Sequence, residues 1–283
     1  MNIIDGRALA QKIRAELKEK IAVLGQKPGL GVILVGNDPA SRLYVSLKEK
    51  ACLEAGINFE KRLFSAETKE ELILEAVEQF NQAPNINGIL VQLPLPSHFD
   101  ANRVISALNP KKDADGFHPH NIQLLKEGRP LIEPVLAKAV WALIEAALKE
   151  RGEPDKKQAL IIGKSDVFAE TLEYFLRQKG LEAAHLHPEQ ISSSPNKCGN
   201  ADIIIVALGR PNALSAADFK DGAIVIDVGI NRLPDGRCVG DINWPSTQNK
   251  TGWITPVPGG VGPVTVVMLL ENVFILSQKQ NAA

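Results

Sequence analysis

The chain has 283 residues, nearly twice the length of a typical domain, which favours two domains over one. Hydrophobic residues make up 45% and charged residues 23%, which excludes disordered, collagen-like and disulfide-rich classes. The 32 Lys and Arg are balanced by 33 Asp and Glu, and a chain without a basic excess is a poor match for nucleic acid.

The cysteines and the apolar segments indicate the cellular compartment of the protein. Cys52, Cys198 and Cys238 are odd in number and far apart in sequence, which favours reduced thiols in the cytoplasm. The first 20 residues carry charges throughout and predict an amphipathic helix, not a signal peptide. No stretch reaches the roughly 20 apolar residues that span a bilayer, because Glu271 and Asn272 interrupt the most apolar late segment. We therefore expect a cytoplasmic protein with no membrane partner.

Short apolar runs alternate with longer helical patterns, which predicts a parallel sheet covered by helices. In the first half, the expected strands are Leu30–Val35 and Gly88–Leu93, and the expected helices are Pro39–Ala55 and Thr68–Gln82. Asp38 can cap the first of these helices, and a proline suits its first turn.

The second half repeats the alternation. Its expected strands are Ala159–Ile162, Ala183–Leu186, Ile203–Leu208 and Ala223–Val228, preceded by a helix over Pro134–Leu148 and followed by a final helix from Val264. The charged segment 149–157 carries Gly and Pro and marks a break in composition. The sequence thus predicts an α/β protein with two domains.

Tyr44 and Lys48 are the first candidates for chemistry. They are four residues apart on the helix expected over 39–55, which puts both on one face, one turn apart. A lysine whose pKa is lowered can transfer protons in a cleft. The same spacing fits a solvated charged face, since Glu49 and Lys50 are neighbours.

Gln92 ends the strand expected over 88–93 and is followed by Pro94 and Pro96, which fix the exit of the chain. Ligands of open α/β sheets bind at the carboxyl ends of strands, so Gln92 is a candidate ligand contact. The alternative is a loop glutamine that is satisfied by its own neighbours.

Two acids and two histidines follow in the segment 111–120. Asp113, Asp115, His118 and His120 invite a metal site, but their spacing matches neither an EF-hand loop nor a zinc signature. A single carboxylate that accepts two hydrogen bonds from an amidine-like ligand edge is the better prediction, without a metal.

Two glycine-containing turns complete the candidates. Gly163, Lys164 and Ser165 follow an expected strand and precede a helix, where backbone N–H groups and the helix dipole suit a dinucleotide phosphate. The G-x-G-x-x-G pattern is absent, so a plain strand–helix turn remains the alternative. The segment 255–263 has three glycines and three prolines, typical of a rigid loop with close backbone approach.

Together these segments closely resemble the bifunctional methylenetetrahydrofolate dehydrogenase/methenyltetrahydrofolate cyclohydrolase family. The shared segments, in the family's order, are YVSLK (44–48), GILVQLPLP (88–96), KDADGFHPHN (112–121), IDVGINR (226–232), VGD (239–241) and TPVPGGVGP (255–263). The resemblance implies a parallel-sheet, folate-binding catalytic domain at 1–136, joined by the C-terminal helix 264–283. It also implies a Rossmann-like NAD(P)-binding domain at 137–263, and a homodimer.

The resemblance also implies roles. Lys48 is the central acid/base residue, Gln92 hydrogen-bonds it, and Tyr44 stacks along the folate as a catalytic and binding residue. Asp115 grips the pterin edge. The implied folate-binding residues are Tyr44, Leu93, Asp115, Pro258 and Gly259; the implied cofactor-binding residues are Gly163, Lys164, Ser165 and Ile230; no metal is implied.

The cofactor half departs from the family pattern. Ala169 and Thr171 stand where the family has glycine and proline, and Glu170 adds negative charge near the start of the helix. Pro188, within His187-Pro188-Glu189, follows the second strand of this half in place of a Ser or basic residue. Lys164 can meet a 2′-phosphate, which favours NADP, with NAD as the alternative. We expect crowding and repulsion at this turn to weaken dinucleotide binding.

The resemblance implies NADP-dependent oxidation of 5,10-methylenetetrahydrofolate to 5,10-methenyltetrahydrofolate and its hydrolysis to 10-formyltetrahydrofolate, within one-carbon metabolism and purine biosynthesis. One alternative is a cyclohydrolase with weak, altered or lost dehydrogenase activity. Another is a noncatalytic folate-binding relative, against which the Lys48–Gln92 pair argues. A generic Rossmann dehydrogenase is disfavoured by the absent glycine fingerprint.

Overall fold

The computed structural model describes residues 1–151, 157–192 and 198–281. The chain divides into two units, which we treat separately. Unit 1 comprises Met1–Ala10 and Ala137–Thr265, and unit 2 comprises Gln11–Leu136 and Val266–Ala283. Of the charged segment 149–157, residues 152–156 lie outside the described part of the chain.

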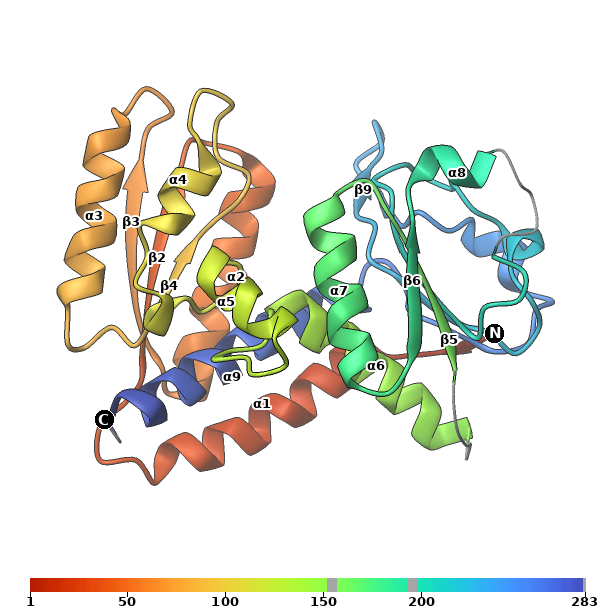
Figure 1. Cartoon of the computed structure of the whole chain (residues 1–283), viewed down its shortest axis with the longest axis horizontal. Helices are drawn as coiled ribbons and strands as arrows, with labels where there is room; N and C mark the ends of the chain where they lie inside the picture. Colours follow the sequence, from red (N-terminus) through yellow and green to blue (C-terminus); the bar gives the residue numbers. More distant parts are fainter. Residues whose placement is uncertain (152–156, 193–197, 282–283) are drawn as a thin grey trace. The chain divides into compact units, whose positions relative to one another are not determined.

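Unit 2 is built on a three-stranded parallel sheet in the order β3-β2-β4. Its strands are β2 (Gly29–Val35), β3 (Asn58–Phe64) and β4 (Gly88–Val91). The connecting helices α2 (Pro39–Ala55) and α3 (Glu70–Gln82) lie on opposite faces of this sheet (Figure 1). That arrangement follows from right-handed crossovers that run in opposite directions across the sheet, first from β2 to β3 and then from β3 to β4. The remaining helices with residues in unit 2 are α1 (Gly6–Ala22), α4 (Ala101–Ser106), α5 (Pro119–Lys126), α6 (Val135–Arg151) and α9 (Val261–Asn281).

The C-terminal helix α9 packs on β4 in unit 2. A Cβ at Gly88 would lie 2.9 Å from a methyl of Val273 and 3.0 Å from Cβ of Ala114, so the glycine permits the close approach. Asn272 is fully buried, and its Nδ2 donates to the carbonyls of Ala114 and Glu133, each at 2.9 Å. By length and composition α9 is apolar enough to span a membrane, contrary to the sequence-based expectation, but more than half of its apolar stretch is buried within the structure.

Unit 1 contains a six-stranded parallel sheet in the order β1-β11-β8-β7-β5-β6. Its strands are β1 (Asn2–Ile3), β5 (Gln158–Gly163), β6 (Glu182–Leu186), β7 (Ile203–Ala207), β8 (Ile224–Asp227) and β11 (Trp253–Ile254). A small antiparallel pair joins β9 (Asn231–Arg232) and β10 (Cys238–Val239). The helices α7 (Asp166–Gln178) and α8 (Pro188–Ser192) follow β5 and β6, and α7 packs on both strands (Figure 1). Short 3₁₀ segments span Pro110–Lys112 in unit 2, and Ala216–Asp218 and Trp244–Thr247 in unit 1.

The strand order places a topological switch point between β5 and β7. From β5 the chain passes through α7 to β6 on one side, and then returns to form β7 on the other side. In open α/β sheets the crevice outside the carboxyl ends of such strands is where ligands bind. The turn at 163–165 follows β5 at this point.

The structure assigns the first ten residues to a different domain from the predicted one. The prediction placed them in the folate-binding domain. They belong to unit 1 because β1 pairs with β11 at the edge of the six-stranded sheet. The amide of Asn2 donates to Gly252 O at 2.7 Å, and the amide of Ile4 donates to Ile254 O at 2.9 Å. A strand of two residues is too short to show a periodicity in sequence.

Candidate active site

The helix α2 carries two of the candidate residues, and its ends are set by its own sequence. Asp38 caps the helix by accepting a hydrogen bond from Ser41 N at 2.7 Å, with Pro39 at the first helical position. Gly56 ends it in the left-handed conformation, at φ 86°. Between these caps, Tyr44 and Lys48 lie one turn apart and are both half-buried.

Lys48 and Gln92 meet at the carboxyl end of β4. Lys48 Nζ donates to Gln92 Oε1 at 2.7 Å, so the hydrogen bond that the resemblance implied is present in the structure. Gln92 Nε2 donates to Leu93 O at 2.7 Å, which turns the amide oxygen toward the lysine. The backbone of Gln92 donates to Ile33 O at 2.9 Å and continues the ladder of β2 and β4. The amide is therefore fixed as an acceptor for the lysine.

The surroundings of Lys48 favour its neutral form. Burial lowers the pKa of Lys48 from its ordinary value, and the charge of Asp115 only partly offsets this effect. One turn further along α2, burial raises the pKa of the Cys52 thiol to about 12. The thiol therefore stays protonated near neutral pH, and Lys48 is the group on this face of α2 suited to proton transfer.

Asp115 lies on a segment that extends the sheet of unit 2 beside β4. The amide of Ala114 donates to Ile89 O at 3.1 Å, and Asp113 forms an isolated parallel bridge with Ile89. Burial raises the pKa of Asp115 to about 6, although the positive charge of Lys48 lowers it in part. Lys48 and Asp115 thus interact electrostatically within unit 2.

The other carboxylate of this motif holds the loop together. Asp113 is buried, and its oxygens accept from Gly116 N at 3.0 Å, His118 N at 2.8 Å and Asn121 Nδ2 at 2.9 Å. With both oxygens engaged in this way, Asp113 fits a structural role better than a metal ligand. Sequence reasoning assigned Asp113 no such role.

The basic residues of the motif also have structural contacts. Lys112 Nζ donates to Phe80 O and Ala83 O, at 3.1 and 2.8 Å, and so satisfies carbonyls at the end of α3. His118 caps α5 by accepting from His120 N at 3.1 Å. Of this motif, Asp115 is the carboxylate left to recognise a ligand.

The other residues implied for the folate site divide between the units. Leu93 is exposed at the end of β4 in unit 2. Pro258 and Gly259 belong to unit 1, where Gly259 has φ 113° and lies close to the side chain of Arg7. A Cβ at Gly260 would lie 2.6 Å from Pro256 O, so this loop has the close backbone approach that its glycines and prolines predicted.

The candidate cofactor turn lies at the carboxyl end of β5. Gly163 is buried there, and Lys164 and Ser165 are exposed. Ser165 caps α7 by accepting from Phe168 N at 3.3 Å. Ile230 is exposed just after β8, on the same edge of the sheet. These positions fit a dinucleotide bound outside the carboxyl ends of the strands.

The structure corrects the expected crowding by Ala169 and Thr171. Their side chains are 1% and 3% exposed, so they face the interior of unit 1 and not the space outside the sheet. Glu170 is half-buried, and Pro188 begins α8. Spacing along the turn did not show which side of the helix each residue occupies.

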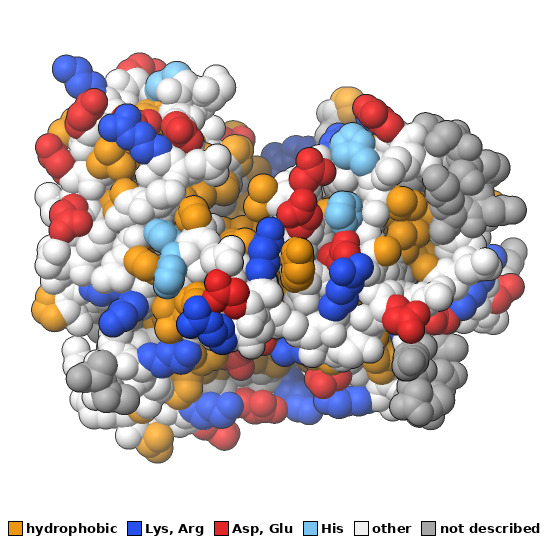
Figure 2. Space-filling model, viewed as in Figure 1, with side chains coloured by type: hydrophobic (Ala, Val, Ile, Leu, Met, Phe, Trp, Pro, Cys, Tyr) orange, Lys and Arg blue, Asp and Glu red, His pale blue; other side chains and the backbone are white. Residues whose placement is uncertain are grey.

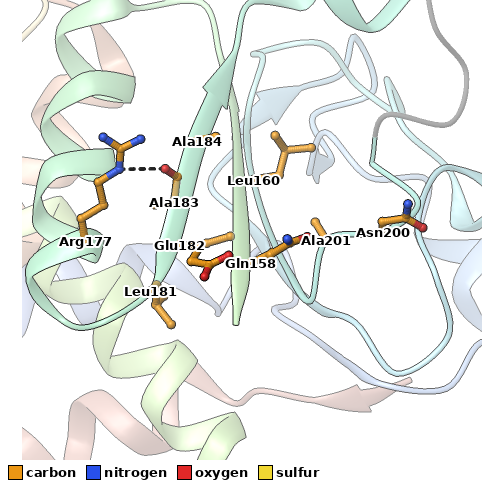
Figure 3. Close-up of a pocket in the computed structure, with 10 residues that line it drawn as sticks. Gln158, Leu160, Arg177, Leu181, Glu182, Ala183, Ala184, Asn200 and Ala201 are labelled. Carbon is orange, nitrogen blue, oxygen red and sulfur yellow. Dashed lines mark hydrogen bonds between the residues drawn. The ribbon is translucent and has the colours of Figure 1, made fainter. Parts of the chain in front are cut away.

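The surface charge is mixed, and a pocket in unit 1 lies away from the candidate cofactor turn. On the face shown in Figure 2, acidic and basic side chains alternate over both units, with no broad basic area among the described residues. Figure 3 shows a pocket in unit 1 at the start of β5 and β6, where Arg177 Nε donates to Ala183 O at 2.9 Å. It lies at the amino ends of these strands, opposite the edge that carries the cofactor turn.

Both halves of the chain match the same family. Residues 4–115 match "Tetrahydrofolate dehydrogenase/cyclohydrolase, catalytic domain", and residues 134–281 match "Tetrahydrofolate dehydrogenase/cyclohydrolase, NAD(P)-binding domain". The chain is 40% identical over 282 residues to the bifunctional protein FolD of Geotalea uraniireducens, covering 98% of this chain and 99% of that protein. It is 42% identical to the bifunctional protein FolD of Moorella thermoacetica, over 95% of this chain and 96% of that protein.

Solved structures agree with these matches. The bifunctional FolD methylenetetrahydrofolate dehydrogenase/cyclohydrolase of Campylobacter jejuni has a TM-score of 0.89 and 38% identity, covering 100% of both chains. The Trypanosoma brucei FolD, solved with NADP cofactor and an inhibitor, has a TM-score of 0.91 and 33% identity, covering 99% of this chain and 98% of that one. The chain therefore belongs to the tetrahydrofolate dehydrogenase/cyclohydrolase family.

Proposed function

We propose that the protein oxidises 5,10-methylenetetrahydrofolate with NADP and hydrolyses the resulting 5,10-methenyltetrahydrofolate to 10-formyltetrahydrofolate. The observation that carries this proposal is the hydrogen bond of 2.7 Å from Lys48 to Gln92, beside the carboxylate of Asp115. The site thus combines a lysine of lowered pKa with a carboxylate suited to a pterin. Family membership and relatives named as bifunctional support both activities.

In the hydrolytic step, neutral Lys48 is the general base. Water attacks the methenyl carbon of the cationic substrate, and Lys48 Nζ takes one of the two water protons, which gives a neutral carbinolamine. One carbon–nitrogen bond then breaks: the nitrogen that leaves takes the proton from Lys48 Nζ, the hydroxyl oxygen becomes the formyl carbonyl, and the hydroxyl proton is released to solvent. Gln92 Oε1 orients Nζ, Tyr44 stacks along the folate, and Asp115 binds the pterin edge. Leu93, Pro258 and Gly259 contribute to folate binding.

In the oxidative step, NADP supplies the hydride acceptor. Gly163, Lys164, Ser165 and Ile230 would hold it at the carboxyl ends of the strands of unit 1. Lys164 is exposed there and provides the positive charge that favours a 2′-phosphate. The NADP-bound Trypanosoma brucei relative supports this cofactor.

The cellular setting is part of the same proposal. We place the protein in the cytoplasm as a homodimer that supplies one-carbon units for purine biosynthesis. The free thiols of Cys52, Cys198 and Cys238 support a reducing compartment.

The test is to titrate the protein with NADP and NAD and, beside this, to assay hydrolysis of methenyltetrahydrofolate. We expect reduction of NADP with methylenetetrahydrofolate as substrate, and hydrolysis without added dinucleotide. Hydrolysis without NADP reduction would support a cyclohydrolase with lost dehydrogenase activity, to which the charge of Glu170 near the start of α7 would contribute. Folate binding without either reaction would contradict the proposal.

A further inference from the structure

Two buried carboxylates at the carboxyl edge of unit 1 have no part in the function described so far. Asp227 ends β8, and Asp241 follows β10; they are 3% and 0% exposed. Both belong to sequence segments shared with the family, 226–232 and 239–241. A buried carboxylate is costly unless its oxygens are hydrogen-bonded. Their partners therefore show what the two groups do.

Asp241 binds the loop that follows β7. Its Oδ2 accepts from Leu208 N at 2.5 Å and Gly209 N at 3.0 Å, and its Oδ1 accepts from Arg210 N at 2.9 Å. Oδ1 also accepts from Asn231 Nδ2 at 2.9 Å. Gly209 has φ 60°. Successive backbone N–H groups that converge in this way form an anion-binding concavity, and here Asp241 occupies it.

Asp227 holds Asp241 in turn. Its Oδ1 accepts from Asp241 N and Gly229 N, both at 3.0 Å, and its Oδ2 accepts from Ile242 N at 2.9 Å. A Cβ at Gly229 would overlap the Asp241 carboxylate, and a Cβ at Gly240 would overlap that of Asp227. The glycines of both shared segments thus leave room for the two carboxylates.

The loop that Asp241 holds is at the switch point of the sheet. Residues 208–210 follow β7 directly, and β7 lies next to β5, which leads into the candidate cofactor turn. A Cβ at Gly209 would lie 3.9 Å from Lys164 Nζ, so the two loops are neighbours. Whatever fixes this loop also shapes the crevice for the dinucleotide.

We propose that Asp241, held in place by Asp227, is a positioning residue for the dinucleotide, because it fills the concavity of the 208–210 amides and fixes that loop beside the cofactor turn. The inference rests on the proposed function.

The experiment measures NADP affinity and methenyltetrahydrofolate hydrolysis in Asp241→Asn. This variant keeps the size of the side chain but replaces an acceptor oxygen with a donor that faces backbone N–H groups. We expect the Kd for NADP to rise at least about 10-fold, because the loop loses its central acceptor. Hydrolysis, which depends on Lys48 and Gln92 in unit 2, should stay within about twofold of the parent.

The matched control is Asp202→Asn in the same unit. Asp202 also accepts a backbone N–H, from Gln158 at 3.0 Å, but at the amino ends of β5 and β7. Its loss should leave NADP affinity within about twofold of the parent. If Asp241→Asn fails to fold, Asn231→Ala removes one donor to Asp241 and should raise the Kd about two- to fivefold.

The outcomes separate this inference from the proposed function. A folded Asp241→Asn with parental NADP affinity would contradict the positioning role, as would equal losses in Asp202→Asn. Where only Asn231→Ala folds, parental affinity in that variant would contradict it as well. A parent protein that binds no NADP would contradict the proposed function itself, and with it the inference.

Discussion

Lys48 and Asp115 influence each other's charge at the candidate folate site. Burial disfavours the charged form of both groups, which lowers the pKa of Lys48 and raises the pKa of Asp115 to about 6. Their mutual attraction opposes both shifts. Near neutral pH Asp115 is therefore ionised and available for ligand recognition. The lowered pKa of Lys48 makes its deprotonation less costly than that of an exposed lysine.

Asp115→Asn should weaken folate binding by about 1–3 kcal/mol, roughly 5- to 150-fold in Kd. The amide keeps the size of the side chain but turns a donor toward the donors of the pterin edge. Isothermal titration with a folate analogue measures the change. Prolonged chelation is the accompanying control and should leave activity intact; activity that is lost to chelator and restored by zinc would reverse the assignment.

The same carboxylate predicts how folate affinity depends on pH. Above its pKa of about 6 Asp115 is ionised and, in its proposed role, would accept the pterin's hydrogen bonds, whereas below that pH it becomes protonated and loses acceptors. Folate affinity should therefore be level at pH 7–8 and fall as the pH drops through about 6. Titrations between pH 5 and 8 test this, and an equally steep fall in Asp115→Asn would assign the effect to another group.

At the scale of elements, α9 supports the segment that carries Asp115. Asn272 ties the carbonyls of Ala114 and Glu133 to the helix, so Asn272→Ala leaves two carbonyls without this donor. We expect the free energy of unfolding to fall by about 1–3 kcal/mol, measured by urea denaturation. Gln278→Ala, at an exposed position of the same helix, is the control and should change it by less than about 0.5 kcal/mol. Equal effects in the two variants would contradict this role of Asn272.

The helix α7 gives a second prediction at this scale. Because Ala169 is buried, Ala169→Gly removes a packed methyl from a helix interior and should destabilise the protein by about 1–2 kcal/mol. NADP affinity should remain within about twofold of the parent. Tighter NADP binding in this variant would show that the methyl does crowd the dinucleotide.

The sequence predicted the elements with strong patterns and missed those that tertiary contacts define. The caps and the apolar face of α2 allowed its bounds, Pro39–Ala55, to be predicted, and the structure confirms them. The edge strand β3 was missed because its residues, NFEKRLF, are largely exposed and charged. β1 and β11 were missed because each has two residues.

Within the site, motif resemblance pointed to Lys48, Gln92 and Asp115, but it gave no role to Asp113, two residues before Asp115. The structural role of Asp113 became visible only through its hydrogen-bond partners, which local sequence does not show. Asp241 binds amides about 30 residues earlier in the chain, a pairing that the fold alone creates.

At the scale of the whole molecule, the proposed proton-transfer residues belong to unit 2 and the proposed dinucleotide-binding residues to unit 1. Variants of one unit should therefore separate the two properties. Lys48 offers the sharpest test of this separation, because Lys50 provides a matched lysine on the same helix. The side chain of Lys50 is 76% exposed, 4.0 Å from Glu54.

The measurement is methenyltetrahydrofolate hydrolysis and NADP affinity in Lys48→Met, beside Lys50→Met. Methionine keeps the length of the side chain and removes the titrating amine, so hydrolysis in Lys48→Met should fall at least about 100-fold. NADP affinity should stay within about twofold of the parent, and Lys50→Met should retain both properties. Hydrolysis near the parental rate in Lys48→Met would contradict the account.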